Sequence, residues 1–479
     1  MVEREDQTRL AEMPSAADQQ ALWSRIISGS GWALGGKAFL AVKGILANIL
    51  LARLLTPSEF GAFFLAQGIV ALGSSVGMLG LNRSIVRLIA ESEAVGRPWR
   101  AARAVRQSFL LAAAGALVTL LVFIAFREWL VLRLFKSPLL YGAIWLVGGW
   151  VVFNSLQQFI AESFRGFHDI RMATFISGVL SGSLLLAGLG IMMSLGRGGL
   201  GAVLWLMLVS AAITVALGML LLRDRLSQLK RSPTVDDSAA DAISMGEILR
   251  LSFPMLVANV TFFVFGYADI WVAGAFRPEA DVAVYGAASR LVTLIGMPLV
   301  VVNMVVPPLI AELHGQGRTG ELQSMLRQMA TLSGLPALLV LLLFAAAAGP
   351  LLNFVFGEFY LAGTGVLVLL SLGAISNVWA GSCGIALMMT GYERQHMVLT
   401  MTVSAATVAM MVAGVQLRGI DGLAAGASLG LILQNVGMLL LVRKHLGIWT
   451  HVTVRGIQPA TILAALRNQR SRSSSNVEL

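Results

Sequence analysis

Long apolar runs separated by short polar stretches make up most of this chain. Each run holds about 20 residues, which as an α-helix would cross a hydrocarbon core of ~30 Å. The pattern therefore predicts an all-α integral membrane protein. About twelve transmembrane helices are expected, with approximate spans 31–52, 61–81, 107–126, 139–161, 174–194, 200–222, 250–274, 284–309, 329–349, 361–388, 397–416 and 421–442.

Composition excludes a large soluble protein. Of the 479 residues, 57% are hydrophobic and 13% are charged, and the mean hydropathy is +0.79. Soluble domains carry about 25% charged residues, and a soluble protein with several cores would need long polar connections, which this chain lacks. The single cysteine, Cys383, excludes an intrachain disulfide and a cysteine-based metal site.

The distribution of lysine and arginine orients the chain. With the N-terminus in the cytoplasm, the inner segments hold 25 of these residues, the outer loops hold 7, and the other 3 lie within helices. Positive residues concentrate in cytoplasmic loops, so both termini are predicted to be cytoplasmic. The net charge of +10 follows from this topology and does not indicate a nucleic-acid partner.

Similar short sequences recur at a nearly constant interval. LIAE occurs at 88–91 and again at 309–312, an interval of 221. Three further pairs follow at intervals of 221 to 225: FGAF at 60–63 with YGAA at 285–288, Leu134-Phe135 with Val355-Phe356, and RGFHDIRM at 165–172 with TGYERQHM at 390–397. Each half then holds six helices, an even number, so both halves enter the membrane from the same side. The sequence predicts two parallel six-helix repeats, which suit alternating access.

The polar stretches predict the domain limits. Residues 1–28 form a cytoplasmic N-terminal segment without the apolar core and cleavage site of a signal peptide. An N-terminal lobe over 29–222 is joined to a C-terminal lobe over 250–442 by a cytoplasmic linker at 223–249. Residues 443–479 form a basic cytoplasmic tail, either an ordinary positive-inside tail or a segment that anionic lipid attracts.

Two stretches of the sequence resemble one family of transporters. They are LLTPSEFGAFFLAQGIVALGSSVGMLGLNRSIVRLIAE, at 54–91, and LLNFVFGEFYLAGTGVLVLLSLGAISN followed by MMTGYERQHM, at 351–397. Both resemble the bacterial polysaccharide flippases, a branch of the multidrug/oligosaccharidyl-lipid/polysaccharide exporter superfamily. The resemblance covers roughly residues 25–445. Its motifs are helix-packing and turn signatures, which identify the fold better than the substrate.

The resemblance implies a V-shaped exporter of twelve helices in the inner membrane of a bacterium. Such a protein moves undecaprenyl-pyrophosphate-linked oligosaccharides from the cytoplasmic to the periplasmic leaflet for the synthesis of O-antigen, capsule or exopolysaccharide. Its partners would be this substrate and membrane lipids, with a glycan polymerase and a chain-length regulator as further candidates. It would not be an enzyme and would need no cofactor or metal, while coupling to H⁺ or Na⁺ stays open.

Two relatives and one class of enzyme are alternatives. MATE-type multidrug exporters generally carry an acidic residue in the first helix, where this chain has Lys37 and Lys43. Lipid II flippases usually have fourteen helices. A glycan polymerase or ligase would need a large outer loop, whereas every outer connection between the expected spans is under about fifteen residues.

Four charged residues within the expected helices are candidates for a substrate cavity. Lys37 and Lys43 lie in the first helix, Asp269 in the seventh and Arg290 in the eighth. A charge near the bilayer centre costs roughly 2.5–3.5 kcal/mol, and such residues usually face a cavity or a partner. Three cations against one acid predict a cavity suited to an anion such as a pyrophosphate, with Arg290 toward its outer end. Lys37 lies nearer the cytosol and could instead extend its ammonium to the interface.

Neutral polar residues within the expected helices are further candidates for this cavity. Each could contact a sugar headgroup or, alternatively, hydrogen-bond to another helix. They are Gln67, Asn259, Asn303, Asn377 and Gln434.

The repeat also suggests a pairing of charges. The interval of 225 places Asp269 opposite Gly44, one residue from Lys43. Lys43 and Asp269 could pair between the lobes and separate when a pyrophosphate binds the lysine, giving the substrate a higher affinity for one conformation. The alternative is that Asp269 bonds to polar groups within its own lobe.

Overall fold

The computed structural model describes residues 42–196, 198–230 and 244–453. Over these residues the secondary structure is helical without strands, and nine helices are long and apolar enough to cross a membrane. The last of them, α15 (Glu393–Leu446), has non-helical backbone at Arg418 and Gly419, so it supplies two of the predicted spans. Residues 42–54 and α10 (Met245–Phe276) are helical where the first and seventh spans are expected. The protein is an all-α integral membrane protein.

The chain divides into two compact units, Met1–Tyr267 and Ala268–Leu479. The division falls inside α10, whereas the sequence places the boundary between lobes in the linker. Residues 231–243 of that linker lie outside the described residues. The predicted limits of the lobes, linker and terminal segments therefore stay predictions.

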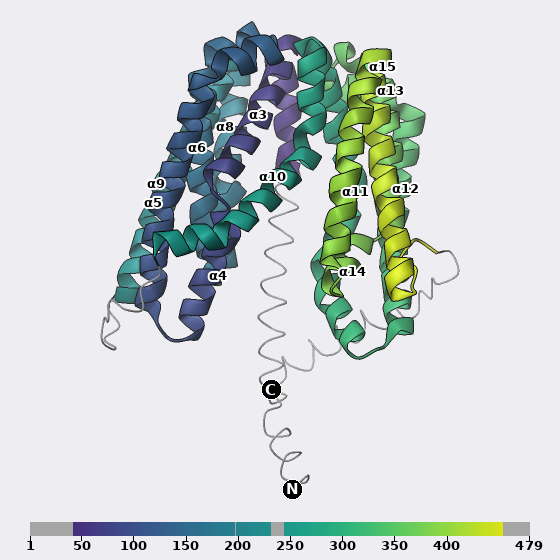
Figure 1. The fold of residues 1–479 in the computed structure, drawn as a ribbon. Helices are drawn as coiled ribbons and strands as arrows, with labels where there is room; N and C mark the ends of the chain where they lie inside the picture. The colour runs from purple at the N-terminus through teal and green to yellow at the C-terminus, as the bar shows by residue number, and fades with distance from the viewer. Residues whose placement is uncertain (1–41, 197, 231–243, 454–479) are drawn as a thin grey trace, which may run out of the picture. The chain divides into compact units, whose positions relative to one another are not determined.

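The first unit is a bundle of long helices joined by short turns (Figure 1). In the capping box that starts α3, Thr56 Oγ1 accepts from the Glu59 N–H at 3.3 Å and the Glu59 carboxylate accepts from the Thr56 N–H at 2.9 Å. Glu59 also accepts from the Leu200 N–H at 3.1 Å, which ties this corner to α9. The helices are α3 (Pro57–Gly77), α4 (Leu81–Ala94), α5 (Pro98–Ala125), the π-helix η1 (Glu128–Leu134), α6 (Pro138–Gly166), α7 (Ile170–Thr174), the π-helix η2 (Phe175–Val179), α8 (Leu180–Ser194) and α9 (Leu200–Lys230).

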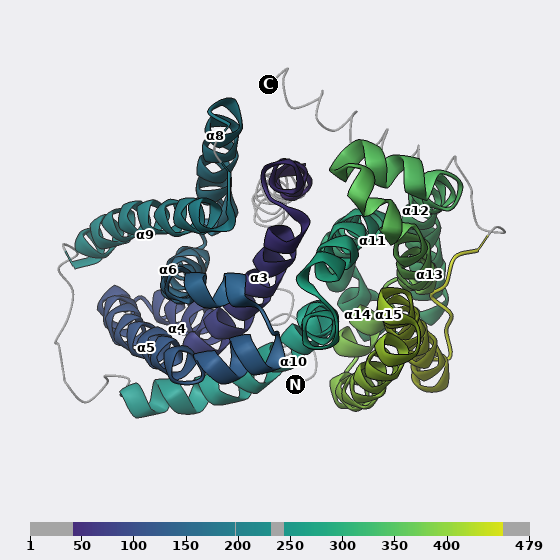
Figure 2. The same cartoon turned by 90° about the horizontal axis from the view of Figure 1, so that it is seen from above.

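The second unit has the same order of long helices with different interruptions. Its helices α11, α12, α13 and α15 pack side by side (Figure 2). Backbone at Ala347 interrupts α12. The elements are α11 (Glu279–Gly315), α12 (Thr319–Phe356), the 3₁₀-helix η4 (Glu358–Gly363), α13 (Thr364–Ala380), α14 (Cys383–Met389) and α15.

Left-handed backbone recurs at matching points of the two units. Four pairs of positions with positive φ recur at intervals of 221 to 223, each after a helix or, for Gly419, at the interruption inside α15: Gly96 and Gly317 (68° and 70°), Lys136 and Gly357 (49° and 111°), His168 and Gly391 (59° and 86°), and Gly196 and Gly419 (61° and 61°). Such backbone is uncommon and favours glycine. The shared positions therefore show that the chain follows one path twice, which confirms the internal repeat.

The helix ends confirm two sequence landmarks and correct two others. LIAE is confirmed, because in each unit it ends three residues before a helix end, at Ala94 and Gly315. The pair at Phe135 and Phe356 is also confirmed, because each residue directly precedes a left-handed residue.

The pairing of FGAF with YGAA at 225 is wrong by about one turn, since the starts of α3 and α11 are related by an interval of 222. The pairing of RGFHDIRM with TGYERQHM is wrong by two residues, since the turns there match at 223. Similar small and aromatic letters recur at one-turn spacing in apolar helices, which explains the error of one turn.

The repeat extends into the packing of each unit. One buried core forms around α4, α5 and α6 in the first unit, and another around α11, α12 and α14 in the second. Four pairs of fully buried residues occupy equivalent places in these cores at an interval of 221: Ile85 and Val306, Ile89 and Ile310, Ala101 and Leu322, and Val105 and Leu326. Burial of these side chains stabilises both bundles through the hydrophobic effect.

Several helices extend beyond the apolar runs that predicted them. α5 begins at Pro98 rather than 107, and α12 at Thr319 rather than 329. The added turns of α5 are amphipathic: Ala101 and Ala104 are buried, while Arg103 is exposed. An amphipathic turn is stabilised by burial of one face, so a search for continuous apolar residues misses it.

Candidate functional site

Lys43 from the first helix packs against α8. Its side chain is half-buried. A Cβ atom on Gly182 would lie 2.2 Å from Lys43 Cδ and 3.1 Å from Lys43 Nζ, so a side chain at that position would displace the lysine. The glycine thus leaves the space that the stem and ammonium of Lys43 occupy.

The segment before Gly182 is an irregular and polar part of its helix. The π-helix η2 has i→i+5 hydrogen bonds, which interrupt the regular α-helical ladder, and such turns are frequent at functional sites. Gln157 of α6 donates from Nε2 to the Ile176 carbonyl at 2.7 Å and to Ser181 Oγ at 3.2 Å. A buried amide therefore holds η2 and the start of α8 directly before the residue that contacts Lys43.

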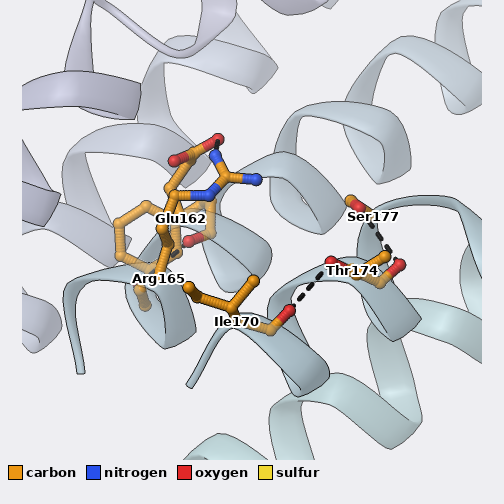
Figure 3. Close-up of polar contacts among 7 residues, drawn as sticks. Glu162, Arg165, Ile170, Thr174 and Ser177 are labelled. Carbon is orange, nitrogen blue, oxygen red and sulfur yellow. Dashed lines mark hydrogen bonds and ion pairs between the residues drawn. The ribbon is translucent and has the colours of Figure 1, made fainter. Parts of the chain in front are cut away.

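Hydroxyl groups stabilise the entry to η2 (Figure 3). Thr174 Oγ1 donates to the Ile170 carbonyl at 2.8 Å, and Ser177 Oγ donates to the Thr174 carbonyl at 3.2 Å. On α6, Arg165 pairs with Glu162. This ion pair is partly exposed, and such pairs contribute at most about 1 kcal/mol. These contacts shape the backbone rather than provide a charged binding site.

Polar side chains also line the contact between α3 and α6. Gln158 Nε2 donates to Ser74 Oγ at 3.3 Å. The predicted site residue Gln67 is half-buried and lies seven residues before Ser74, about two turns away on the same face of α3. Gln67 therefore belongs to a helix face that already carries one hydrogen bond between helices.

Asp269 and Tyr285 come together in the second unit. The Asp269 carboxylate accepts from Tyr285 Oη at 3.1 Å and from the Ile270 N–H at 2.8 Å. Arg290 lies five residues after Tyr285 on α11 and attracts the carboxylate electrostatically. Tyr285 is fully buried. A carboxylate and a phenol thus meet between α10 and α11, and these bonds favour the alternative in which Asp269 is satisfied within its own lobe.

The predicted asparagines of the second unit lie near the break between α13 and α14. Asn303 of α11 accepts from Ser382 Oγ at 2.6 Å, so its amide oxygen holds the start of α14. Asn377 is half-buried on α13, and its backbone carbonyl accepts from the Gly381 N–H at 3.2 Å. Asn303 therefore acts as an interhelical contact in this structure.

Two predicted residues cannot be placed. Lys37 lies outside the described residues, and the side chain of Asn259, on α10, is not described. Sequence reasoning missed Gln157, Gly182 and Tyr285. A pair of glutamines inside an apolar helix was a visible signal for Gln157. Tyr285 was noticed only as a repeat landmark, and the role of Gly182 depends on a contact with another helix.

Comparisons with known proteins agree on the architecture. A family model described as polysaccharide biosynthesis protein matches residues 26–314, and a model described as MatE matches residues 254–415. No match is found among curated proteins.

Solved structures of three transporters share the fold. An inward-facing multidrug resistance MATE family transporter of the MOP superfamily is 17% identical, with a TM-score of 0.70 over 85% of this chain and 94% of that chain. Lipid II flippase MurJ, in an inward closed conformation, is 13% identical, with a TM-score of 0.66 over 86% of this chain and 87% of that chain. A MOP superfamily transporter from Pyrococcus furiosus is 16% identical, with a TM-score of 0.59 over 88% of this chain and 95% of that chain.

The repeated helical bundle of this chain is the fold that these solved structures share. The chain belongs to the polysaccharide biosynthesis protein family, whose model matches more than half of its length.

Proposed function

We propose that the protein is a flippase that translocates undecaprenyl-pyrophosphate-linked oligosaccharide repeat units across the bacterial inner membrane. The product would feed the synthesis of O-antigen, capsule or exopolysaccharide. The match to the polysaccharide biosynthesis family over residues 26–314 carries this proposal. The cations Lys43 and Arg290 within the spans support it, because a diphosphate is an anion and buried cations favour anions.

In this proposal the two lobes give the substrate access to each side of the membrane in turn, as duplicated bundles do. Lys43 and Arg290 would attract the diphosphate. The side-chain amides of Gln67 and Asn377 would hydrogen-bond to sugar hydroxyls. Binding drives the conformational change only if the substrate binds one conformation more tightly than the other. Both termini would be cytoplasmic, and a glycan polymerase and a chain-length regulator would receive the product on the far side. The coupling ion, H⁺ or Na⁺, is left open.

Depletion of the protein tests this function. We expect lipid-linked oligosaccharide to accumulate and to be protected from a glycosidase added to intact spheroplasts. Accumulated oligosaccharide that the glycosidase can reach would contradict a flippase and would instead indicate a defect in polymerisation.

A multidrug exporter is the second candidate, because the MatE model matches residues 254–415 and a MATE transporter shares the fold. It predicts that depletion raises susceptibility to cationic drugs without changing surface polysaccharide. The shared fold of MurJ raises lipid II flipping as a third candidate. That function predicts that depletion blocks cell-wall synthesis rather than polysaccharide export.

Reporter fusions test the proposed topology. Fusions after Gly199 and Gly419 should report a periplasmic position, and one after Arg231 a cytoplasmic position. A cytoplasmic signal after Gly199 would contradict the orientation.

A further inference from the structure

A groove of about 560 Å³ runs between α5 and α9 in the first unit. Its walls are mainly apolar and come from both helices: Val105, Phe109, Leu110, Met219, Leu222 and Leu226. Two arginines, Arg106 of α5 and Arg223 of α9, also line it. The helices run side by side at this point (Figures 1 and 2). The groove therefore combines an apolar wall with two positive charges.

The two arginines mark where the apolar stretches of their helices end. α5 reads PWRAARAVRQ up to this level and is apolar from Phe109 onward, while α9 is apolar up to Leu222 and continues as RDRLSQLK. Arg106 and Arg223 are therefore at the level of lipid headgroups, and the apolar wall extends toward the acyl chains. Both arginines are exposed. The nearby acid Asp224 accepts from Gln228 Nε2 at 3.1 Å and does not line the groove.

The second unit covers the equivalent face with its own chain. Thr331 corresponds to Leu110 at the interval of 221, and its hydroxyl donates to the Thr453 carbonyl at 3.1 Å. The Trp449 N–H donates to Gln323 Oε1 on the same helix at 2.8 Å, and the guanidinium of Arg443 lies 5.4 Å from the Trp449 ring. The segment 448–453 thus supplies apolar and aromatic groups to a surface that the first unit leaves as a groove.

The chemistry of the groove indicates what covers it. Arginine binds phosphate oxygens with a fixed pair of N–H groups, and basic pockets between membrane helices bind lipid headgroups. The linker that follows α9 reads RSPTVDDSAADAI at 231–243, which has no aromatic residue and three aspartates. Such a polar sequence does not suit the apolar wall, whereas an acyl chain does.

We propose that this groove binds an anionic phospholipid, with its phosphate between Arg106 and Arg223 and its acyl chains against the apolar wall. The bound lipid takes the place that segment 448–453 holds in the second unit. The bound lipid would stabilise the lipid-facing surface of the first unit. It is independent of the substrate that the protein transports.

Native mass spectrometry of the full-length protein in detergent tests this site. Phosphatidylglycerol and phosphatidylcholine are titrated onto the wild type and onto Arg106→Gln/Arg223→Gln. We expect the wild type to prefer phosphatidylglycerol, and the double variant to bind it about 30-fold more weakly, because each cation near a membrane surface contributes roughly a factor of five. The control is Arg103→Gln/Arg225→Gln, which removes two exposed arginines from the same helices that do not line the groove. Its affinity should be little changed.

A second pair of variants tests the apolar wall without changing charge. Leu110→Trp places a bulky ring in the groove, whereas Leu117→Trp places one on the same helix outside it. Only the first should lower phosphatidylglycerol binding. Equal losses in the groove variants and their controls would overturn the proposal. So would a gain in lipid binding by Asp236→Asn/Asp237→Asn, because that result would show that the linker occupies the groove. Displacement of phosphatidylglycerol by undecaprenyl-diphosphate-linked oligosaccharide, but not by equimolar undecaprenyl phosphate, would assign the groove to the substrate instead.

Discussion

The first two helices of each repeat align at an interval of 222, and at this interval apolar residues of the first repeat correspond to polar residues of the second. The first helix ends at Leu54 and α10 at Phe276, while α3 begins at Pro57 and α11 at Glu279. The corresponding residues in the first and second units are Ala47 and Asp269, Phe63 and Tyr285, and Gly68 and Arg290. The scaffold therefore forms without charge at these positions, so the polar cluster is an addition of the second unit.

The units also break different helices. In the first unit the chain turns at Gly80 (φ 79°), where a Cβ would lie 2.1 Å from the Ser252 carbonyl of α10. In the second unit it turns at Gly381 (φ 72°), where a Cβ would lie 2.8 Å from the Thr450 carbonyl. In both units the segment that follows the sixth helix packs on the break. Packing of a later segment on a glycine turn thus stabilises both interruptions.

The largest expected effect concerns the break of the second unit. Gly381→Ala adds left-handed strain and a clash with Thr450, so we expect a loss of about 3 kcal/mol in the free energy of unfolding. Thermal unfolding in detergent measures it. The control Gly391→Ala also has a positive φ (86°), with open space around its Cβ. Its free energy of unfolding should therefore fall only by the cost of the backbone strain. Equal shifts would mean that packing by the C-terminal segment does not matter.

A smaller effect is expected when the polar cluster is converted to the apolar one. Asp269→Ala should cost about 2–3 kcal/mol, because it removes the carboxylate to which the buried Tyr285 hydroxyl donates, and Tyr285→Phe about 1.5 kcal/mol. The double variant carries the residues of the first unit and should cost less than the sum of both. In the opposite direction, Phe63→Tyr should destabilise the first unit by burying a new hydroxyl. Strict additivity would show that Asp269 and Tyr285 do not interact.

Variants of Lys43 and of its neighbour Gly182 test whether transport requires the charge of Lys43 or only its packing. Lys43→Met keeps the stem and removes the ammonium, so we expect export of polysaccharide to fall about tenfold with little change in the melting temperature. Gly182→Ala should also reduce export by displacing the lysine, whereas Gly190→Ala, on the same helix with open space around its Cβ, should not. Full export by Lys43→Met would remove Lys43 from the substrate site.

The smallest effect is expected for coupling between Lys43 and Asp269. Asp269 has hydrogen-bond partners in its own unit, and the interval of 222 places it opposite Ala47, about one turn from Lys43. A double-mutant cycle on export with Lys43→Ala and Asp269→Ala should give a coupling below about 0.5 kcal/mol. Recovery of export by the charge swap Lys43→Asp/Asp269→Lys would instead establish a pair between the units.

The sequence was sufficient for the architecture but only partly for the site. Apolar runs and LIAE identified the membrane helices and the repeat, because burial in lipid constrains every residue of a span. The breaks at Gly80 and Gly381 were missed, since each depends on contact with a distant segment. Asp269 and Arg290 stood out as charges in apolar helices. The hydrogen bond between Asp269 and Tyr285 could not be read from the sequence, because a tyrosine in a membrane helix is not unusual.

Reconstitution into liposomes tests the proposed flippase most directly. Vesicles carry a fluorescent undecaprenyl-diphosphate-linked oligosaccharide, and a membrane-impermeant quencher reaches only the outer leaflet. Without protein, the share of the labelled oligosaccharide in the inner leaflet stays fluorescent, because the quencher cannot reach it. We expect the wild-type protein to make this share accessible as well, and Lys43→Met to do so more slowly. An inner-leaflet share that stays protected in vesicles containing the wild-type protein, under both a proton and a sodium gradient, would contradict the proposed function.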